Sequence, residues 1–161
     1  MLLTSPTIKG AITGILMAIV MVILYTLDIP ASSGLKFLVH IIYAAGIIWT
    51  LYTFSRSSAY DGKFSSLFGQ GFRCFIIVVL ILVAFTTIFS MLHPEEAEKA
   101  ARFYREDLVR QGNKTPDEID ALVAKAKKQY TTGLVSITIF GYLITGTLIT
   151  AAASAILMRR K

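Results

Sequence analysis

Charged residues are scarce in this chain. Asp, Glu, Lys and Arg make up 16% of its 161 residues, whereas they make up about 25% of an ordinary soluble domain. Hydrophobic residues account for 55% of the chain. This balance excludes an ordinary soluble domain and indicates a protein that lies in a membrane.

Residues that bind metals or act as nucleophiles are also few. The chain has one cysteine, Cys74, and two histidines, His40 and His93. A single cysteine excludes a disulfide within the chain, and the two histidines are too far apart in the sequence to form a spaced ligand motif. No glycine-rich loop follows a strand pattern, as a phosphate-binding loop requires. We therefore expect no catalytic residue, no metal and no cofactor, and we expect that the chain is not an enzyme.

Acidic residues are missing from the middle of every long apolar segment. Ionisable groups inside a bilayer are costly and mark ion or proton pathways, but Asp28 and Asp61 both fall in the expected loops. This pattern argues against a transporter that depends on a buried carboxylate. A pore or a lipid-moving protein that works without one stays open.

Four long apolar segments dominate the sequence. A helix that crosses a bilayer needs roughly 20 apolar residues, because each residue adds about 1.5 Å across a core about 30 Å thick. The segments are apolar all round, unlike the amphipathic helices of soluble proteins, and they are too long for strands of a membrane barrel. The first is also longer than the apolar part of a signal peptide, so we expect it to be retained. The predicted fold is a single all-α membrane domain, residues 1–161, with four transmembrane helices at about 8–27, 35–54, 72–92 and 134–158.

Residues 93–130 form a charged segment between the third and fourth apolar segments. Pro94 suits the first turn of a helix, and Gly112 suits its end. Thr115 and Glu118 have the spacing at which each side chain caps the backbone of the other at the start of a second helix. The segment is therefore predicted to be a helical hairpin inserted into the membrane domain. Whether its second helix continues into the fourth span stays open at this level.

The distribution of cations predicts an orientation in the membrane. With four crossings, both termini lie on one side, together with the loop between the second and third segments. That side has seven cations against one acid, whereas the side with residues 93–130 has no net charge. Total cation counts do not decide the question, but the orientation rule gives most weight to Lys and Arg in short loops near helix ends. We therefore expect cytoplasmic termini and a hairpin outside the cytoplasm. The seven cations are Lys9, Arg56, Lys63, Arg73, Arg159, Arg160 and Lys161.

Small residues recur every four positions along the first and the last apolar segments. Such rows let helix backbones approach closely, which matters because lipid supplies no hydrophobic force between helices. We expect the rows either to pack the first and last helices within the chain or to contact a membrane protein partner or a second copy. The rows are Gly10, Gly14 and Ala18 in the first segment and Gly146, Thr150 and Ser154 in the last.

The loop of residues 55–71 carries aromatic residues and cations on roughly one helical face. This pattern is typical of a segment that lies among lipid headgroups, either as a plain connector or as a site for lipid phosphate. Nucleic acid is a poor interpretation of the net charge of +6, because the excess cations border the apolar segments. We therefore expect membrane lipids, and no nucleic acid, as partners. The candidate headgroup residues are Arg56, Lys63, Phe64, Phe68 and Arg73.

Several motifs together resemble a known family. They are YDGKFSSLFGQGFR at residues 60–73, QGNKTPDEID at residues 111–120, and a last segment of small residues that ends in MRRK. With the four spans, they are similar to the bacterial membrane family catalogued as domain of unknown function four-one-nine-nine. The resemblance implies a bacterial inner-membrane protein without an assigned activity. It also implies a neighbourhood of genes that includes a glycosyltransferase acting on polyprenyl phosphate.

Two hypotheses from different classes follow. The first is a noncatalytic accessory subunit that binds a membrane partner, linked to polyprenyl-phosphate glycosylation. The second is a small transporter or flippase for a lipid-linked substrate. A membrane enzyme is a third and weaker hypothesis.

Overall fold

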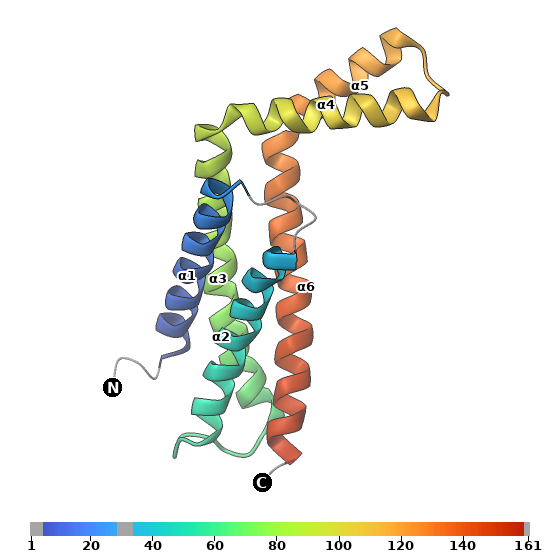
Figure 1. Cartoon of the computed structure of the whole chain (residues 1–161). Helices are drawn as coiled ribbons and strands as arrows, with labels where there is room; N and C mark the ends of the chain where they lie inside the picture. Colours follow the sequence, from blue (N-terminus) through green and yellow to red (C-terminus); the bar gives the residue numbers. More distant parts are fainter. Residues whose placement is uncertain (1–4, 29–33, 160–161) are drawn as a thin grey trace. The chain divides into compact units, whose positions relative to one another are not determined.

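A computed structural model describes residues 5–28 and 34–159 of the chain, apart from the side chain of Lys36. Throughout these ranges the regular structure is helical and contains no strand (Figure 1), which confirms the all-α prediction. Arg160 and Lys161, two cations of the predicted cytoplasmic tail, lie outside the described residues. The elements are α1 (Pro6–Thr26), the short 3-10 turn η2 (Gly34–Lys36), α2 (Phe37–Ser55), α3 (Phe64–Leu92), α4 (Pro94–Gln111), α5 (Pro116–Lys128) and α6 (Tyr130–Arg159).

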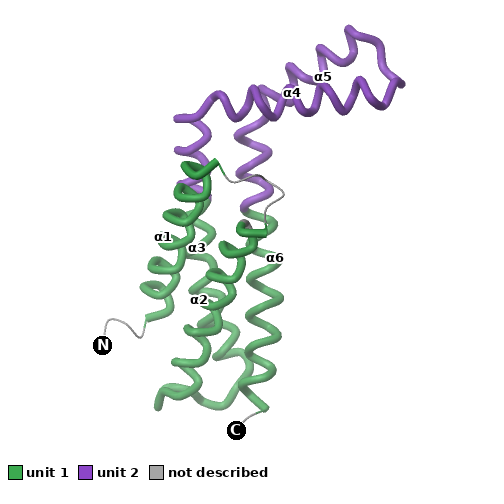
Figure 2. Tube along the Cα trace, viewed as in Figure 1, with its two compact units in different colours: residues 1–82, 139–161 green, residues 83–138 purple. Residues whose placement is uncertain are grey.

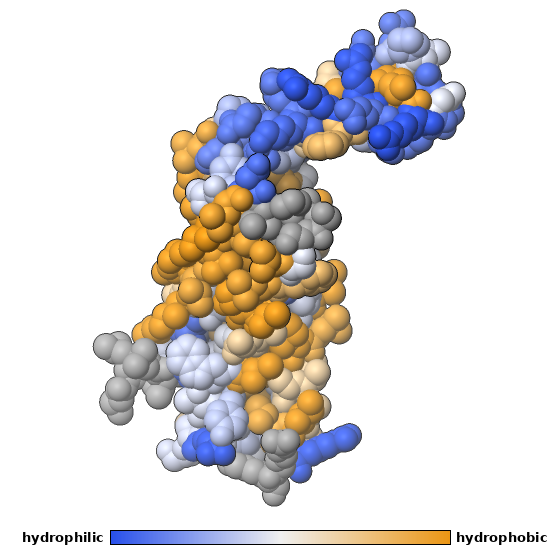
Figure 3. All heavy atoms as spheres, viewed as in Figure 1, coloured by the Kyte–Doolittle hydropathy of each residue, from blue (hydrophilic) through white to orange (hydrophobic). Residues whose placement is uncertain are grey.

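Four of the helices, α1, α2, α3 and α6, are long and apolar enough to cross a membrane. They expose large apolar side chains: Leu80 of α3 is 60% exposed, and Phe140 and Leu148 of α6 are 65% and 66% exposed. Contiguous apolar surface of this kind is unfavourable in water and favourable in lipid. Figure 3 shows apolar residues over these helices and hydrophilic residues over α4 and α5. The number of predicted spanning segments is therefore confirmed.

The helix of the third span begins before the predicted span. α3 begins at Phe64, so residues 64–71 of the predicted connector are helical. Asp61 accepts a hydrogen bond from the backbone N–H of Lys63 at 3.1 Å, and its pKa is lowered, first by a hydrogen bond from Ser66 and then by the Lys63 N–H. Leu67 is fully buried one turn into the helix. The start of the membrane span at residue 72 stays a prediction.

The chain divides into two compact units (Figure 2): unit 1 holds residues 1–82 and 139–161, and unit 2 holds residues 83–138. Unit 1 has a core of apolar side chains from α1, α2 and α3, to which α6 adds small and half-buried residues. The many van der Waals contacts within this core hold the four helical segments of unit 1 together. The core residues are Met17, Val39, Tyr43, Ile47, Leu51, Leu67, Phe75, Val78 and Leu82.

Unit 2 contains α4 and α5, which pack through Ala101, Leu108 and Ile119. Both predicted ends are confirmed. α4 ends at Gly112, whose positive φ of 64° is the left-handed conformation that glycine adopts without strain. α5 begins with the reciprocal cap of Thr115 and Glu118, in which the Thr115 N–H donates to Glu118 Oε2 at 2.8 Å.

The second helix of the charged segment and the last span are two helices, separated by a single residue. α5 ends at Lys128 and α6 begins at Tyr130, with Gln129 between them. The Gln129 N–H still bonds to the Lys125 carbonyl at 3.0 Å. Residues 131–133 therefore lie in the first turn of α6 rather than in a separate loop.

We predict that acid loosens the start of α5. The Thr115 backbone N–H and hydroxyl donate to the Glu118 carboxylate and lower the pKa of Glu118. The ionised carboxylate therefore stabilises the folded helix above the ordinary glutamate pKa of about 4.3, and this stabilisation is lost as pH falls through the lowered pKa. Hydrogen-exchange protection of the first α5 amides should decline below about pH 4.

The control is Glu118→Gln, whose side-chain oxygen can still accept from the Thr115 N–H. Its protection should not change with pH in this range. Equal pH profiles for the two proteins would contradict the role of the carboxylate.

Candidate functional site

The small-residue row of α1 faces α3. Gly10 and Gly14 are buried, and Ala18 is half-buried. A methyl group at Gly10 would overlap the backbone carbonyl of Cys74, and one at Gly14 would lie 3.1 Å from Ile81 Cδ1. The glycines therefore let the two backbones approach closely, as expected of small residues between membrane helices.

The row of α6 lies against α2 and α3. Gly146, Thr150 and Ser154 are the buried residues of this helix. A methyl group at Gly146 would overlap the Tyr43 hydroxyl and approach Phe75, and Thr150 packs on Gly71 of α3. Both predicted rows thus have close neighbours within unit 1. For the glycines of the two rows these neighbours lie on α2 and α3, and not on each other's helix.

Two glycines that the sequence analysis did not single out complete these contacts. Gly46 of α2 lies against the Thr13 side chain, and Gly71 of α3 lies against Thr150. A glycine within a helix weakens the helix and therefore signals a packing role, although Gly69, two residues before Gly71, has no neighbour of this kind. The sequence shows this signal, but it does not identify the side chain that fills the space.

Hydroxyl groups in unit 1 bond mainly to backbone carbonyls. Thr13 donates to the Lys9 carbonyl at 2.8 Å, and Tyr43 donates across to the Tyr142 carbonyl of α6 at 2.8 Å. Thr50 donates to the Gly46 carbonyl at 2.9 Å and contacts the sulfur of buried Cys74 at 3.3 Å. Each of these hydroxyls thus has a hydrogen-bond acceptor on a helix backbone, as a low-dielectric interior requires.

Lys9 is more enclosed than a cation at the edge of a span would be. It is 1% exposed, and its Nζ lies 5.1 Å from the centroid of the Trp49 ring. An ammonium over an indole face is a favourable cation–π contact. From the sequence we expected Lys9 to be a charge at the edge of the first span. Only the packing of α1 on α2 shows that Trp49 lies over it.

The predicted headgroup residues extend from the end of α2 into the N-terminal part of α3. Arg56 is exposed and its Cζ lies 4.6 Å from the Tyr52 ring centroid. Phe64 and Phe68 stack on each other with ring centroids 5.8 Å apart, and Arg73 is exposed. Lys63 lies 3.8 Å from Asp61 and is therefore the member of this group with an acidic neighbour.

The two histidines and the cysteine lie apart in different surroundings. His40 stacks on Tyr142 at 5.7 Å in unit 1. His93 Nδ1 lies 3.1 Å from the Phe89 carbonyl in unit 2. Within residues 5–28 and 34–159, no three His, Cys, Asp or Glu side chains are grouped as metal ligands.

The charged side chains of α4 and α5 pair across the two helices. Lys127 Nζ lies 2.6 Å from Glu98 Oε1, and Arg105 binds Asp120. Lys99 of α4 binds Glu96 at 2.7 Å. The Lys127 hydrogen bond and charge lower the pKa of Glu98. The side chains of the two pairs between α4 and α5 are half or more exposed, so they form an open surface rather than an enclosed site.

Four exposed apolar helices, tight glycine contacts and a charged helix pair define a multi-pass helical membrane protein. The chain belongs to the family described as Protein of unknown function (DUF4199), which it matches over residues 9–159. This match confirms the family resemblance seen in the sequence. No curated protein and no solved structure matches the chain.

We predict that Gly71→Ala destabilises unit 1. The new methyl group would overlap Thr150, and overpacking of a tight core costs about 1–3 kcal/mol. The thermal unfolding midpoint in detergent should fall. Gly69→Ala on the same helix is the matched control, because nothing lies within 4 Å of the added methyl group; it should be neutral or stabilising, since alanine favours a helix.

Thr150→Ser distinguishes the contact from a general effect. Removing the Thr150 methyl group should restore much of the stability of the Gly71→Ala protein. A Gly71→Ala protein as stable as the Gly69→Ala protein would show that the helices do not approach at this position.

Proposed function

We propose that this chain is a noncatalytic accessory subunit of the bacterial inner membrane, which binds a membrane partner. The observation that supports it best is that polar side chains do different things in the two units. In unit 1 the buried hydroxyls of Thr13, Tyr43 and Thr50 bond to helix backbone. In unit 2 the charges lie on an exposed pair of helices. A packed unit 1 and an open polar surface in unit 2 suit binding better than chemistry.

In this proposal the α4–α5 pair is a charged helical hairpin outside the cytoplasm, and both termini are cytoplasmic. The cations near the ends of the spans support this orientation, because Arg56 and Lys63 lie in the 56–63 loop and Arg73 lies in the N-terminal part of α3. Arg56 on Tyr52 is also a pairing typical of the headgroup region. A link to polyprenyl-phosphate glycosylation stays a prediction from the resemblance alone.

A flippase or small transporter for a lipid-linked substrate is the second candidate. The hydroxyls of Thr150 and Ser154 are fully buried and have no hydrogen-bond partner in the described part of the chain. A buried hydroxyl without a hydrogen-bond partner raises the free energy of this conformation relative to a conformation in which the hydroxyl has a partner. They therefore favour a bundle that opens, as a lipid-moving protein must.

The two candidates predict different results when the tagged protein is purified in mild detergent. The subunit proposal predicts a second membrane protein that elutes with the chain at constant stoichiometry through size-exclusion chromatography. A chain that purifies alone, and that moves fluorescent lipid between leaflets after reconstitution, would overturn it and support the transporter.

Cysteine labelling in intact cells tests the orientation, with Cys74 replaced by Ala. A membrane-impermeant maleimide should label a cysteine at Asn113, in the α4–α5 turn, because this turn is expected outside the cytoplasm. It should not label a cysteine at Gly62 unless the cells are opened first. The reverse pattern would reverse the orientation.

A further inference from the structure

A groove runs along one side of the α4–α5 pair. It consists of three adjacent hollows, of about 260, 270 and 340 Å³, and Arg105 lines all three. The groove extends on α4 from Glu98 to Val109, which corresponds to about 16 Å along the helix axis. We refer to it as the α4–α5 groove.

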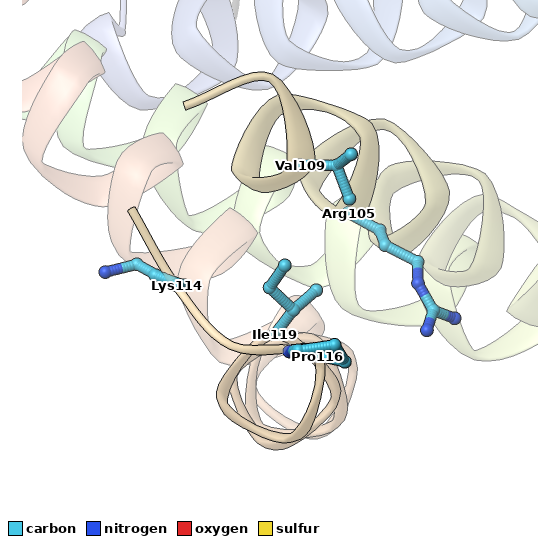
Figure 4. A pocket seen from close by; sticks show the side chains of 5 residues that line it. All are labelled: Arg105, Val109, Lys114, Pro116 and Ile119. Carbon is cyan, nitrogen blue, oxygen red and sulfur yellow. The ribbon is translucent and has the colours of Figure 1, made fainter. Parts of the chain in front are cut away.

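Helical periodicity accounts for the groove. On α4 the lining residues Glu98, Arg102, Arg105 and Val109 follow one another at intervals of four, three and four residues, and therefore share one face. Ile119 projects from α5 toward Val109 of α4, with Pro116 below it and Lys114 extending from the turn (Figure 4).

The floor of the groove is apolar. Ala101 and Ile119 are 8% and 7% exposed, and Val123 is half-buried between the helices. Val109, at the edge, is 59% exposed although it is a large apolar residue on a charged helix. Ala101 and Ile119 are covered by the packing of α4 on α5, so the apolar surface that the groove leaves open to a ligand is that of Val109 and part of Val123.

The rim of the groove is predominantly basic. Five lining residues are cations, Arg102, Arg105, Arg110, Lys114 and Lys127, and two are acids, Glu98 and Glu106. Glu98 is held by Lys127, and Asp120 beside the groove is held by Arg105. Arg110 and Lys114 form no ion pair within the described residues. The rim therefore complements a ligand that carries acidic groups.

We propose that the α4–α5 groove binds an acidic amphipathic helix of a partner protein. Apolar side chains one turn apart would enter the hollows, and carboxylates on either side would meet Arg110 and Lys114, as in other helix-in-groove complexes. The inference rests on the proposed function as a partner-binding subunit. A flat anionic membrane fits less well, because Glu98, Glu106 and Asp120 lie among the cations. A helix can place its carboxylates at Arg110 and Lys114 alone, whereas a uniformly anionic surface cannot.

Two synthetic helical peptides test the groove, with the full chain held in phosphatidylcholine nanodiscs. Both carry leucines at positions i, i+4 and i+7; one has glutamates beside them, and the other has lysines. Fluorescence anisotropy should show the glutamate peptide binding at least about tenfold more tightly than the lysine peptide.

Val109→Asp places a carboxylate at the groove and should weaken binding of the glutamate peptide at least about tenfold. The matched control is Phe103→Asp. Phe103 is 72% exposed on the same helix, and it projects from the face opposite Ala101 because it lies two residues away. It should leave the affinity unchanged.

Three results would overturn the inference: equal affinity for both peptides, equal effects of the two substitutions, or displacement of the glutamate peptide when phosphatidylglycerol is added to the discs. The last would assign the groove to lipid. Selective peptide binding by a chain that purifies without a partner would support the groove and contradict the subunit proposal. A native partner that still binds the Val109→Asp protein at full stoichiometry would support the subunit proposal and contradict the groove.

Discussion

Close approach of helix backbones is the constraint on which unit 1 depends. Lipid surrounds apolar side chains as well as another helix does, so spanning helices associate through van der Waals contact and hydrogen bonds. Gly10 and Gly71 of α1 and α3 leave room for the Cys74 carbonyl and for Thr150. Gly146 likewise leaves room for Tyr43, whose hydroxyl donates to the Tyr142 carbonyl of α6. A side chain at any of these glycines would overlap a neighbouring helix, and the helices would have to move apart.

Unit 2 depends on a small apolar interface and on exposed ion pairs rather than on close backbone approach. α4 and α5 share only three buried apolar residues, Ala101, Leu108 and Ile119. Half-buried Val123 adds to this interface, and the ion pairs Lys127–Glu98 and Arg105–Asp120 are exposed, each worth little in water. A helix pair with so small an apolar interface leaves apolar and basic side chains open along its side. That openness, and not a reaction centre, is the property that the proposed partner binding uses.

The sequence predicted the elements better than their contacts. Pro94, Gly112 and the Thr115–Glu118 cap could be read directly, because the end of a helix depends on residues within one turn of it. The start of α3 was less evident, because burial of Leu67 by residues distant in the sequence adds to the local hydrogen bonds of Asp61. The burial of Lys9 could not be predicted either. Its position in the sequence marks the edge of a span, whereas the residue that covers it, Trp49, belongs to another helix.

Length and hydropathy alone determined that the chain has four membrane-crossing helices and a charged insertion, because each span must satisfy its own backbone hydrogen bonds. The small-residue rows were also visible in the sequence. Only the tertiary structure decided that the glycines of these rows lie against α2 and α3, that Gly46 and Gly71 complete the contacts, and that α4 and α5 form a groove with a basic rim. These features join side chains from different helices, and the spacing along one helix does not specify which neighbour it faces.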